Sequence, residues 1–302
     1  YSQKAGMERV FGSEQLINAR IWSVVETSDQ SIWFGTSYGV YQIRPDGSLS
    51  APLLPHGANN RANEIRSLAV QGDILWIGTR ESLFAYNLKS QSLNAISYFG
   101  ESNFPIINTI IPSQNNQLLV GTFNGISVVD TEMLQTRYIG GQKSILDGVN
   151  VRSMLLDRSG LLWAGTREKG LFRTRLQFEQ FNDWPDPLFM DWQQQQNKAA
   201  LSFVWQQDRL FVGQFDQISW GKPASGKLEF QQLIGARVNA VVVDNEQKVW
   251  LGADNGIWYF DVKTNSFVKD NHILSKAGIF TQNVRDIELL PNGLIAFGLW
   301  SD

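Results

Sequence analysis

One short pattern recurs along the whole of this 302-residue chain: a tryptophan or another apolar residue, a variable residue, a glycine and, in four copies, a threonine. The pattern is complete at Trp33–Thr36, Trp76–Thr79 and Trp163–Thr166. Its glycines lie about 44 residues apart, at Gly35, Gly78, Gly121, Gly165, Gly213, Gly252 and Gly298. A repeat of this length has the size of one β-propeller blade, so seven copies predict seven blades.

Each repeat has the same internal order of an alternating apolar run, a turn, the glycine-containing run and a second turn. Turn-forming residues follow the first run at Asp29-Gln30, Gly72-Asp73, Asn115-Asn116, Ser159-Gly160, Asn245-Glu246 and Asn292-Gly293. A glycine inside a strand is typical of close backbone approach, and the tryptophan before it would bury ~150–250 Å² between blades. We therefore predict an all-β chain, a single seven-bladed propeller domain over residues 1–302 with four-stranded antiparallel blades.

Two segments depart from the repeat. Asp183–Gln196 holds two prolines, two tryptophans and a glutamine run, which predicts an irregular loop. This loop could be a ligand lid or a dimer contact, or its aromatic residues could pack back onto blade edges. The seventh repeat supplies only two strands, so either the segment around Met7–Phe11 donates an outer strand or the natural chain continues.

Composition narrows the possible functions. The chain has no cysteine and only two histidines, His56 and His272, which argues against thiolate or multi-histidine metal sites and against cysteine nucleophiles. Its net charge of -3 is unlike the basic footprint of a nucleic-acid-binding domain. No run of about 18 apolar residues is present, so no segment is expected to span a bilayer. We expect no catalytic residue, no metal site, no cofactor and no nucleic-acid partner.

The segment Asp157–Thr166 reads Asp-Arg-Ser-Gly-Leu-Leu-Trp-Ala-Gly-Thr and resembles the two-component regulator propeller repeat. Ile32–Thr36 and Val249–Ala253 are similar to further copies. The resemblance implies a non-catalytic, extracytoplasmic sensor of a bacterial membrane-anchored signalling protein, located in the periplasm. It also implies a homodimer in the full-length protein, a membrane contact only through segments absent from this chain, and a histidine kinase or diguanylate cyclase as output.

One position of the predicted innermost strands is polar in six of the seven repeats. It is occupied by Trp22, Arg66, Asn108, Arg152, Ser202, Asn239 and Arg285. A polar side chain facing a packed core would be costly, so this column is expected to face a water-filled axis. Further residues are expected in loops on the same face, namely Arg20, Tyr38, Arg61, Arg80, Arg167 and Arg237.

Arginine forks bind carboxylate and sulfate groups through paired hydrogen bonds, each worth ~1.5–3 kcal/mol. We predict a polar or acidic carbohydrate-like ligand, a small molecule or an oligosaccharide, at the mouth of the channel. The predicted binding residues are Trp22, Tyr38, Arg66, Arg80, Asn108, Arg152, Arg167, Asn239 and Arg285. The alternative is that acids pair with these arginines, and the candidates are Glu64, Glu81, Glu168 and Asp286. Loop aromatics on this face, Tyr38, Phe123, Phe215 and Trp300, could stack on sugar rings or simply pack the loops.

Two other functions remain open. Streptogramin-lyase-like propellers have similar repeats but need a histidine with acids and a metal, whereas His56 and His272 are expected to be exposed loop residues outside the column. A protein-interaction propeller, like the WD-repeat proteins, is the other alternative, although the Gly-His and Trp-Asp signatures of those repeats are missing.

Overall fold

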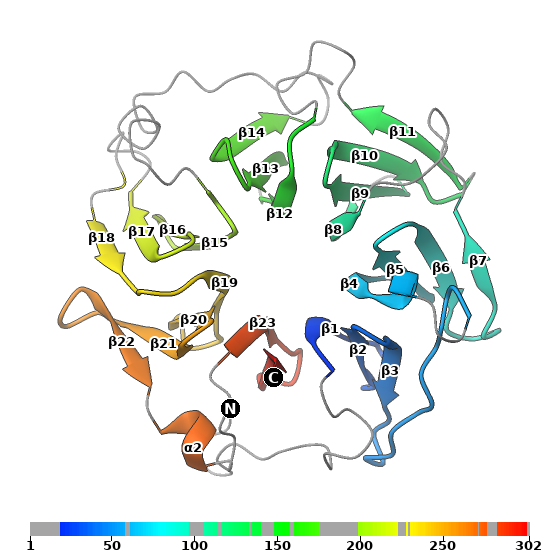
Figure 1. The fold of residues 1–302 in the computed structure, drawn as a ribbon, viewed down its shortest axis with the longest axis horizontal. Helices are drawn as coiled ribbons and strands as arrows, with labels where there is room; N and C mark the ends of the chain where they lie inside the picture. Colours follow the sequence, from blue (N-terminus) through cyan, green and yellow to red (C-terminus); the bar gives the residue numbers. More distant parts are fainter. Residues whose placement is uncertain are drawn as a thin grey trace. The chain divides into compact units, whose positions relative to one another are not determined.

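A computed structural model describes residues 19–57, 61–96, 106–113, 116–132, 134–139, 148–157, 160–175, 199–222, 228, 230–270, 272–276 and 283–300. Within these residues the chain forms small antiparallel sheets joined by turns, together with two very short helical segments (Figure 1). In the same part of the chain, no helix is both long and apolar enough to cross a membrane. The predicted segments Met7–Phe11 and Asp183–Gln196 lie outside the described residues.

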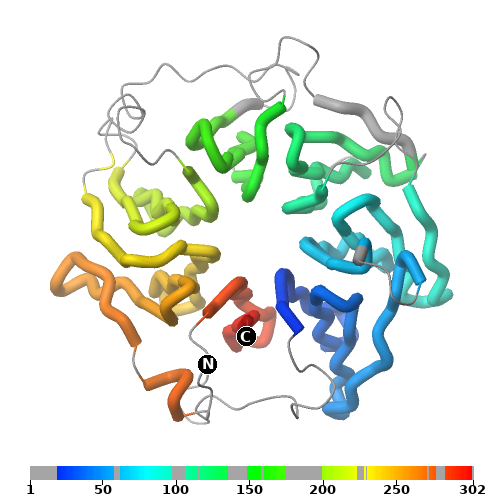
Figure 2. The backbone as a smooth tube through the Cα atoms, in the orientation of Figure 1, coloured from blue at the N-terminus to red at the C-terminus, as the bar shows by residue number. Residues whose placement is uncertain are grey.

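Seven sheets follow one another in sequence, and Figure 2 traces the chain from each to the next. The first holds β1 (Ile21–Glu26), β2 (Ile32–Thr36) and β3 (Gly39–Ile43). The second holds β4 (Ile65–Gln71), β5 (Ile74–Thr79), β6 (Leu83–Asn87) and β7 (Leu93–Ala95), preceded by the 3-10 turn η1 (Arg61–Asn63). The third holds β8 (Ile107–Ser113), β9 (Gln117–Thr122), β10 (Gly125–Asp130) and β11 (Gln135–Ile139). The fourth holds β12 (Val151–Leu156), β13 (Leu161–Thr166) and β14 (Leu171–Arg175).

The remaining sheets come from the C-terminal part of the chain. The fifth holds β15 (Ser202–Gln206), β16 (Arg209–Gly213), β17 (Gln217–Gly221) and β18 (Phe230–Leu233). The sixth holds β19 (Val238–Val243), β20 (Val249–Ala253), β21 (Gly256–Asp261) and β22 (Ser266–Asp270), followed by α2 (Ile273–Lys276). The seventh holds β23 (Asn283–Leu289) and β24 (Ile295–Trp300).

Contacts divide the chain into two compact units. The first unit contains the described residues 25–175 and 199–200, and the second contains residues 19–24 and 201–300. The boundary falls within β1, after Val24. That residues 1–302 form a single domain stays a prediction, and each unit is described by itself below.

Four of the sheets have the predicted four strands, and the others have fewer among the described residues. In the first sheet the edge beside β3 carries only two isolated bridges, Val40 with Leu53 and Ile43 with Leu49. Pro52 lies between the two bridging residues and has no backbone N–H to donate to a sheet. A continuous fourth strand is therefore replaced here by separate contacts.

The turns between the first two strands of each sheet depend on one residue with a left-handed backbone. These residues are Gln30, Gly72, Asn116, Gly160, Gln207, Gln247 and Gly293, with φ between 55° and 82°. Predicted turn positions are confirmed where the structure describes them, except that in the sixth repeat the left-handed residue is Gln247, one position after the predicted pair. Four of these residues are glycine or asparagine, which tolerate this conformation at low cost and make the turn readable from the sequence, and the other three are glutamines.

The core lies between successive sheets, as the tryptophan–glycine pattern predicted. Trp76 is 1% exposed, and Trp33, Trp163 and Trp250 are also buried. A Cβ added to Gly78 would lie 2.5 Å from Cγ2 of Ile107, the first residue of β8 in the next sheet. The same relation holds for Gly35 with Ile65, Gly213 with Val238, and Gly252 with Val284. Each glycine thus lets the first apolar residue of the next inner strand come close, and the fold class is the predicted seven-bladed β-propeller.

Candidate functional site

Five of the polar column residues lie at bulges in their inner strands. In β12 the register passes from Val151 opposite Thr166 to Ser153 opposite Gly165, so Arg152 has no residue opposite it. The same shift in register leaves four further residues without an opposite partner, namely Arg66, Asn108, Asn239 and Arg285. A bulge re-aims a side chain that regular pairing would send into one face of the sheet. The column read from the sequence therefore has a backbone cause.

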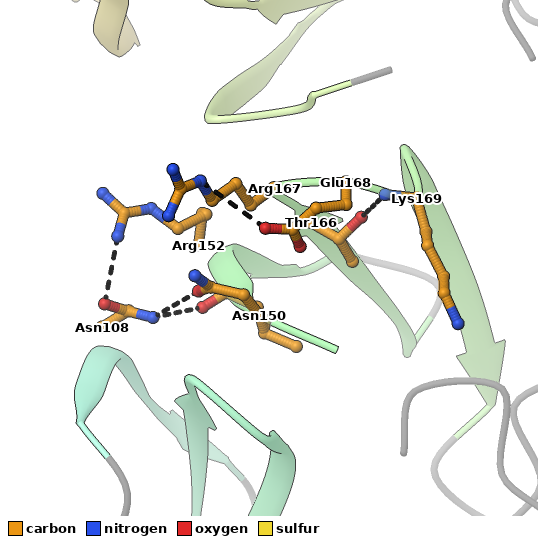
Figure 3. A network of polar contacts seen from close by, with 8 residues as sticks. Asn108, Asn150, Arg152, Thr166, Arg167, Glu168 and Lys169 are labelled. Atoms are coloured by element: carbon orange, nitrogen blue, oxygen red, sulfur yellow. Dashed lines mark hydrogen bonds and ion pairs between the residues drawn. The ribbon is translucent and has the colours of Figure 1, made fainter. Parts of the chain in front are cut away.

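In the first unit the bulged residues of the third and fourth sheets contact each other (Figure 3). Nδ2 of Asn108 donates to the carbonyl oxygen of Val151 at 2.8 Å and to Oδ1 of Asn150 at 3.0 Å. Its Oδ1 accepts a hydrogen bond of 3.3 Å from Nη1 of Arg152. The asparagine therefore ties β8 to β12 and holds one end of the arginine.

The second unit repeats this arrangement between the sixth and seventh sheets. Nδ2 of Asn239 donates to the carbonyl oxygen of Val284 at 2.8 Å, and its Oδ1 accepts from Nη1 of Arg285 at 3.3 Å. Asp254 takes the place of Asn150 as the second acceptor for Asn239, at 2.7 Å. The side chain of Arg285 is only 4% exposed.

Acidic partners hold several of the predicted arginines. Glu64 pairs with Arg66 at 2.7 Å and with Arg80 at 3.3 Å, and Glu168 lies 3.5 Å from Arg167. These pairs are the ones that the alternative interpretation expects. Asp286, another of the candidate acids, is not the partner of Arg285, because Nη1 of Arg285 lies 3.2 Å from Oδ1 of Asp254.

Asp254 is the residue of this site that sequence reasoning missed. Besides Arg285 and Asn239, it faces Nε of Arg237 at 3.7 Å. Asp254 directly follows the second strand of its sheet, which is the position that singled out Arg80 and Arg167. A search of that position for acidic as well as basic residues would have identified Asp254.

Aromatic rings complete the site in the second unit. The guanidinium of Arg20 lies 3.8 Å from the ring centre of Trp300, and that of Arg285 lies 4.3 Å from the same ring. Arg285 is also 5.9 Å from the ring of Trp22. Both tryptophans are partly buried, so the cations rest on rings that water covers only in part.

The threonine of the repeat orders the loops that follow the second strands. Oγ1 of Thr122 donates to the carbonyl oxygen of Gly125 at 3.0 Å and accepts from the backbone N–H of Asn124 at 3.0 Å. Thr36, Thr79 and Thr166 make equivalent bonds. These fixed loops carry Arg80 and Arg167, and they present the aromatic side chains of Tyr38, 53% exposed, and Phe123, 41% exposed.

Of the remaining predicted site residues, Ser202 is buried and regularly paired with Gly213. Neither histidine occupies a position of the column. His272 is exposed as expected, but His56 is partly buried, which corrects the prediction of an exposed loop residue. Its Nε2 lies 3.2 Å from Oγ1 of Thr79, its ring packs edge-on against Phe84, and burial lowers its pKa despite the nearby Glu81. Across the described ranges, no three His, Cys, Asp or Glu side chains gather as a metal site would require.

Bulged polar inner strands on a seven-sheet scaffold define the class of protein as a β-propeller with a polar candidate binding site. The repeat itself is recognised in one copy: a sequence model described as "two component regulator propeller" matches residues 15–38. The chain therefore carries the repeat that its sequence resembles. No curated protein matches the chain in a sequence search.

Solved propellers share the fold at low sequence identity. The extracellular domain of the hybrid two component system BT3049 from B. thetaiotaomicron is 18% identical, with a TM-score of 0.76 over 96% of this chain and 40% of that one. The extracellular domain of BT4673 from the same organism is 17% identical, with a TM-score of 0.76 over 99% and 39%. Virginiamycin B lyase from Staphylococcus aureus is 13% identical, with a TM-score of 0.70 over 95% and 93%. The chain thus spans about two fifths of the two bacterial extracellular domains.

Proposed function

We propose that this chain is a non-catalytic, ligand-sensing domain of a bacterial membrane-anchored signalling protein, exposed to the periplasm. The regulator propeller repeat at residues 15–38 supports this proposal, as does the similarity in fold to extracellular domains of two-component systems. The membrane anchor, the output domain and the dimer contacts would belong to other segments of the protein.

The proposed ligand is polar or acidic and carbohydrate-like. The observation that carries this proposal is the repeated bulge, which directs Arg66, Asn108 and Arg152 in the first unit and Asn239 and Arg285 in the second away from regular strand pairing. Arginine forks provide donors for carboxylate or sulfate groups, and asparagine provides both a donor and an acceptor for hydroxyl groups.

Two features of the second unit favour an acidic ligand. One carboxylate, Asp254, faces two guanidinium groups, and its distances to Arg285 and Arg237 are 3.2 Å and 3.7 Å. Short charge-assisted bonds measure about 2.7–2.9 Å, so Arg237, whose side chain is 31% exposed, can still gain from a further acceptor. Trp22 and Trp300 lie beside Arg285, and their flat apolar rings are the kind of surface on which a sugar ring can rest.

Calorimetry with uronic-acid oligosaccharides and with neutral oligosaccharides of the same length tests the proposal. We expect Arg152→Ala to weaken binding of the acidic series by about tenfold or more, because one charge-assisted hydrogen bond is worth ~1.5–3 kcal/mol. Arg44→Ala is the matched control, since Arg44 is exposed at a turn after β3 and bonds only weakly to Ser48. Equal affinities for Arg152→Ala and the unaltered chain would remove Arg152 from the site, and absence of binding by every oligosaccharide would overturn the ligand class.

A protein-interaction role is the second candidate, and the outer strand of the fifth sheet favours it. Phe230 is 43% exposed and Leu233 is 74% exposed, both on β18. Because the two residues are an odd number of positions apart, they lie on opposite faces of β18 and offer two separate apolar contacts rather than one shared patch. Phe230→Ser with Leu233→Ser would then abolish association with a partner and leave oligosaccharide binding unchanged, whereas the sensing proposal predicts no such loss.

A further inference from the structure

Two carboxyl side chains on β23 occupy positions that are uncharged in other inner strands. The residue after each bulge pairs with the glycine of the next strand, and it is Ser67, Thr109, Ser153 or Ala240 in four sheets. In the seventh sheet this residue is Asp286, opposite Gly298. Two residues further on the equivalent residues are Ala69, Ile111, Leu155 and Val242, whereas β23 has Glu288 opposite Ala296. Because strand side chains alternate, Asp286 and Glu288 share one face of β23.

This face of β23 is packed against the beginning of β1, within the same unit. Cγ2 of Ile21 and Cβ of Asp286 lie 3.1 Å and 3.2 Å from the position that a Cβ on Gly298 would take. The backbone N–H of Val24 donates a hydrogen bond to the carboxyl group of Asp286. Asp286 therefore lies in the contact between the last inner strand and the first.

Few other charges surround the two carboxyl groups. β24, β19 and β20 contain no ionisable residue, β21 contains Tyr259 and Asp261, and β1 contains Glu26. Arg20 directly precedes β1, and its guanidinium lies over the ring of Trp300 on β24. The neighbouring guanidinium of Arg285 is held by Asp254. Among the described residues, neither Asp286 nor Glu288 forms an ion pair, so no described cation compensates a negative charge on either, although backbone hydrogen bonds reach Asp286.

We propose that the contact between β23 and β1 is proton-sensitive: it is held when the carboxyl groups of Asp286 and Glu288 carry protons, and it loosens when they ionise. Burial raises the pKa of Asp286 to about 7, in spite of hydrogen bonds from Ile287 and Val24. Burial and the nearby Asp286 raise the pKa of Glu288 to about 8. Both groups would therefore change their charge close to neutral pH.

The direction of the effect follows from proton linkage. In the unfolded chain the two groups have ordinary pKa values of 3.8 and 4.5, so the folded protein holds protons that the unfolded chain has released. Stability is then greatest at low pH and falls as the pH rises, until both groups have ionised in the folded protein above about pH 8. A buried carboxylate in an ion pair would give the opposite slope.

Urea unfolding of the whole chain at intervals from pH 5.5 to 8.5 tests this proposal. We expect the unfolding midpoint to fall over this range, and we expect the fall to be much smaller in the double variant Asp286→Asn with Glu288→Gln. Asp261→Asn on β21 is the matched control and should keep the slope of the unaltered chain. A flat profile in the unaltered chain, or an unchanged slope in the double variant, would overturn the proposal.

Hydrogen exchange supplies a test that does not depend on whether the double variant folds. After correction for intrinsic rates, the opening constant of the Val24 amide in the unaltered chain should rise by about tenfold or more between pH 6 and pH 8. The amide of Val120, in the centre of the third sheet, should change much less. Equal pH dependence at the two amides would show that the contact between β23 and β1 is not the sensitive element.

Discussion

The side-chain amide of Asn108 donates a 2.8 Å hydrogen bond to the backbone carbonyl of Val151, 43 residues further along the chain. Asn239 makes the same bond to Val284 in the other unit. In both cases the acceptor is the first apolar residue of the next inner strand, and the following residue is an arginine that returns a hydrogen bond to the asparagine. The polar column thus has a structural role between sheets as well as a proposed role toward a ligand.

Removal of this asparagine should destabilise the fold. Asn108→Ala leaves the partly buried carbonyl groups around β12 without their donor, and we expect a loss of ~1–3 kcal/mol in the free energy of unfolding. Denaturant unfolding measures it, with the exposed Asn94→Ala on β7 as the control. Equal stabilities of the two variants would show that the bond to Val151 contributes nothing.

The close approach at Gly121 can be tested with a compensating substitution. A Cβ at this position would lie 2.6 Å from Cγ2 of Thr109 and 3.0 Å from Cγ1 of Val151. Gly121→Ala should therefore cost ~1–3 kcal/mol of stability through overpacking. Adding Thr109→Ser removes the nearer methyl group and should restore part of the loss, so a double-mutant cycle with no coupling would contradict this packing.

Turn aspartates that accept a hydrogen bond from a buried tryptophan should contribute more to stability than those that do not. Oδ2 of Asp244 accepts a 2.8 Å hydrogen bond from Nε1 of the buried Trp250, and Oδ1 accepts from the backbone of Lys248. Asp244→Ala should lower the free energy of unfolding by ~1.5–3 kcal/mol, because bonds to a charged acceptor are lost. Asp46→Ala, at an exposed turn where the aspartate accepts from Ser48, should change it by less than about 0.5 kcal/mol. Thermal unfolding of both variants measures the difference.

The repeat threonine should be needed for its hydroxyl group rather than its shape. Thr122 is completely buried, and Thr122→Val keeps the volume but removes both hydrogen bonds of Oγ1. We expect a loss of ~1–3 kcal/mol in stability. Thr131→Val, which removes an exposed hydroxyl bonded to the carbonyl of Asn116, is the control and should be nearly neutral. Similar losses in the two variants would argue against a special role for the buried turn.

Local patterns explain why much of the fold could be predicted. The tryptophan–glycine pattern seen at Trp76 and Gly78 has the same packing role in each sheet where it occurs. The distance along the chain between successive copies therefore indicates the number of blades. Left-handed turn residues such as Gly72 and Asn116 are equally readable, because few side chains tolerate that backbone. The column containing Arg152 was found for the same reason, since a polar residue interrupts an otherwise apolar strand at a fixed position.

Charge pairing could not be predicted in the same way. Sequence proximity suggested Asp286 as the partner of Arg285, but the bulge at Arg285 directs the two neighbours to different surroundings. The guanidinium meets Asp254 from the preceding sheet, and the carboxyl group of Asp286 meets the backbone of Val24. Likewise, the partial burial of His56 depends on Thr79 and Phe84, which lie in strands or turns of the second sheet.

The sequence by itself determined the β-propeller class, the seven repeats, the turns and the polar position found in six of the seven inner strands. These features depend on backbone conformation and on packing requirements that recur at a fixed spacing, so the same residue types recur at that spacing in the sequence. Tertiary structure alone decided which acid neutralises which arginine, which carboxyl group meets the backbone of β1, and where an asparagine joins two sheets. Electrostatic and hydrogen-bonding partners interact over a few ångströms in space. Residues that folding brings this close are often far apart in the sequence, so their order along the chain does not show which ones pair.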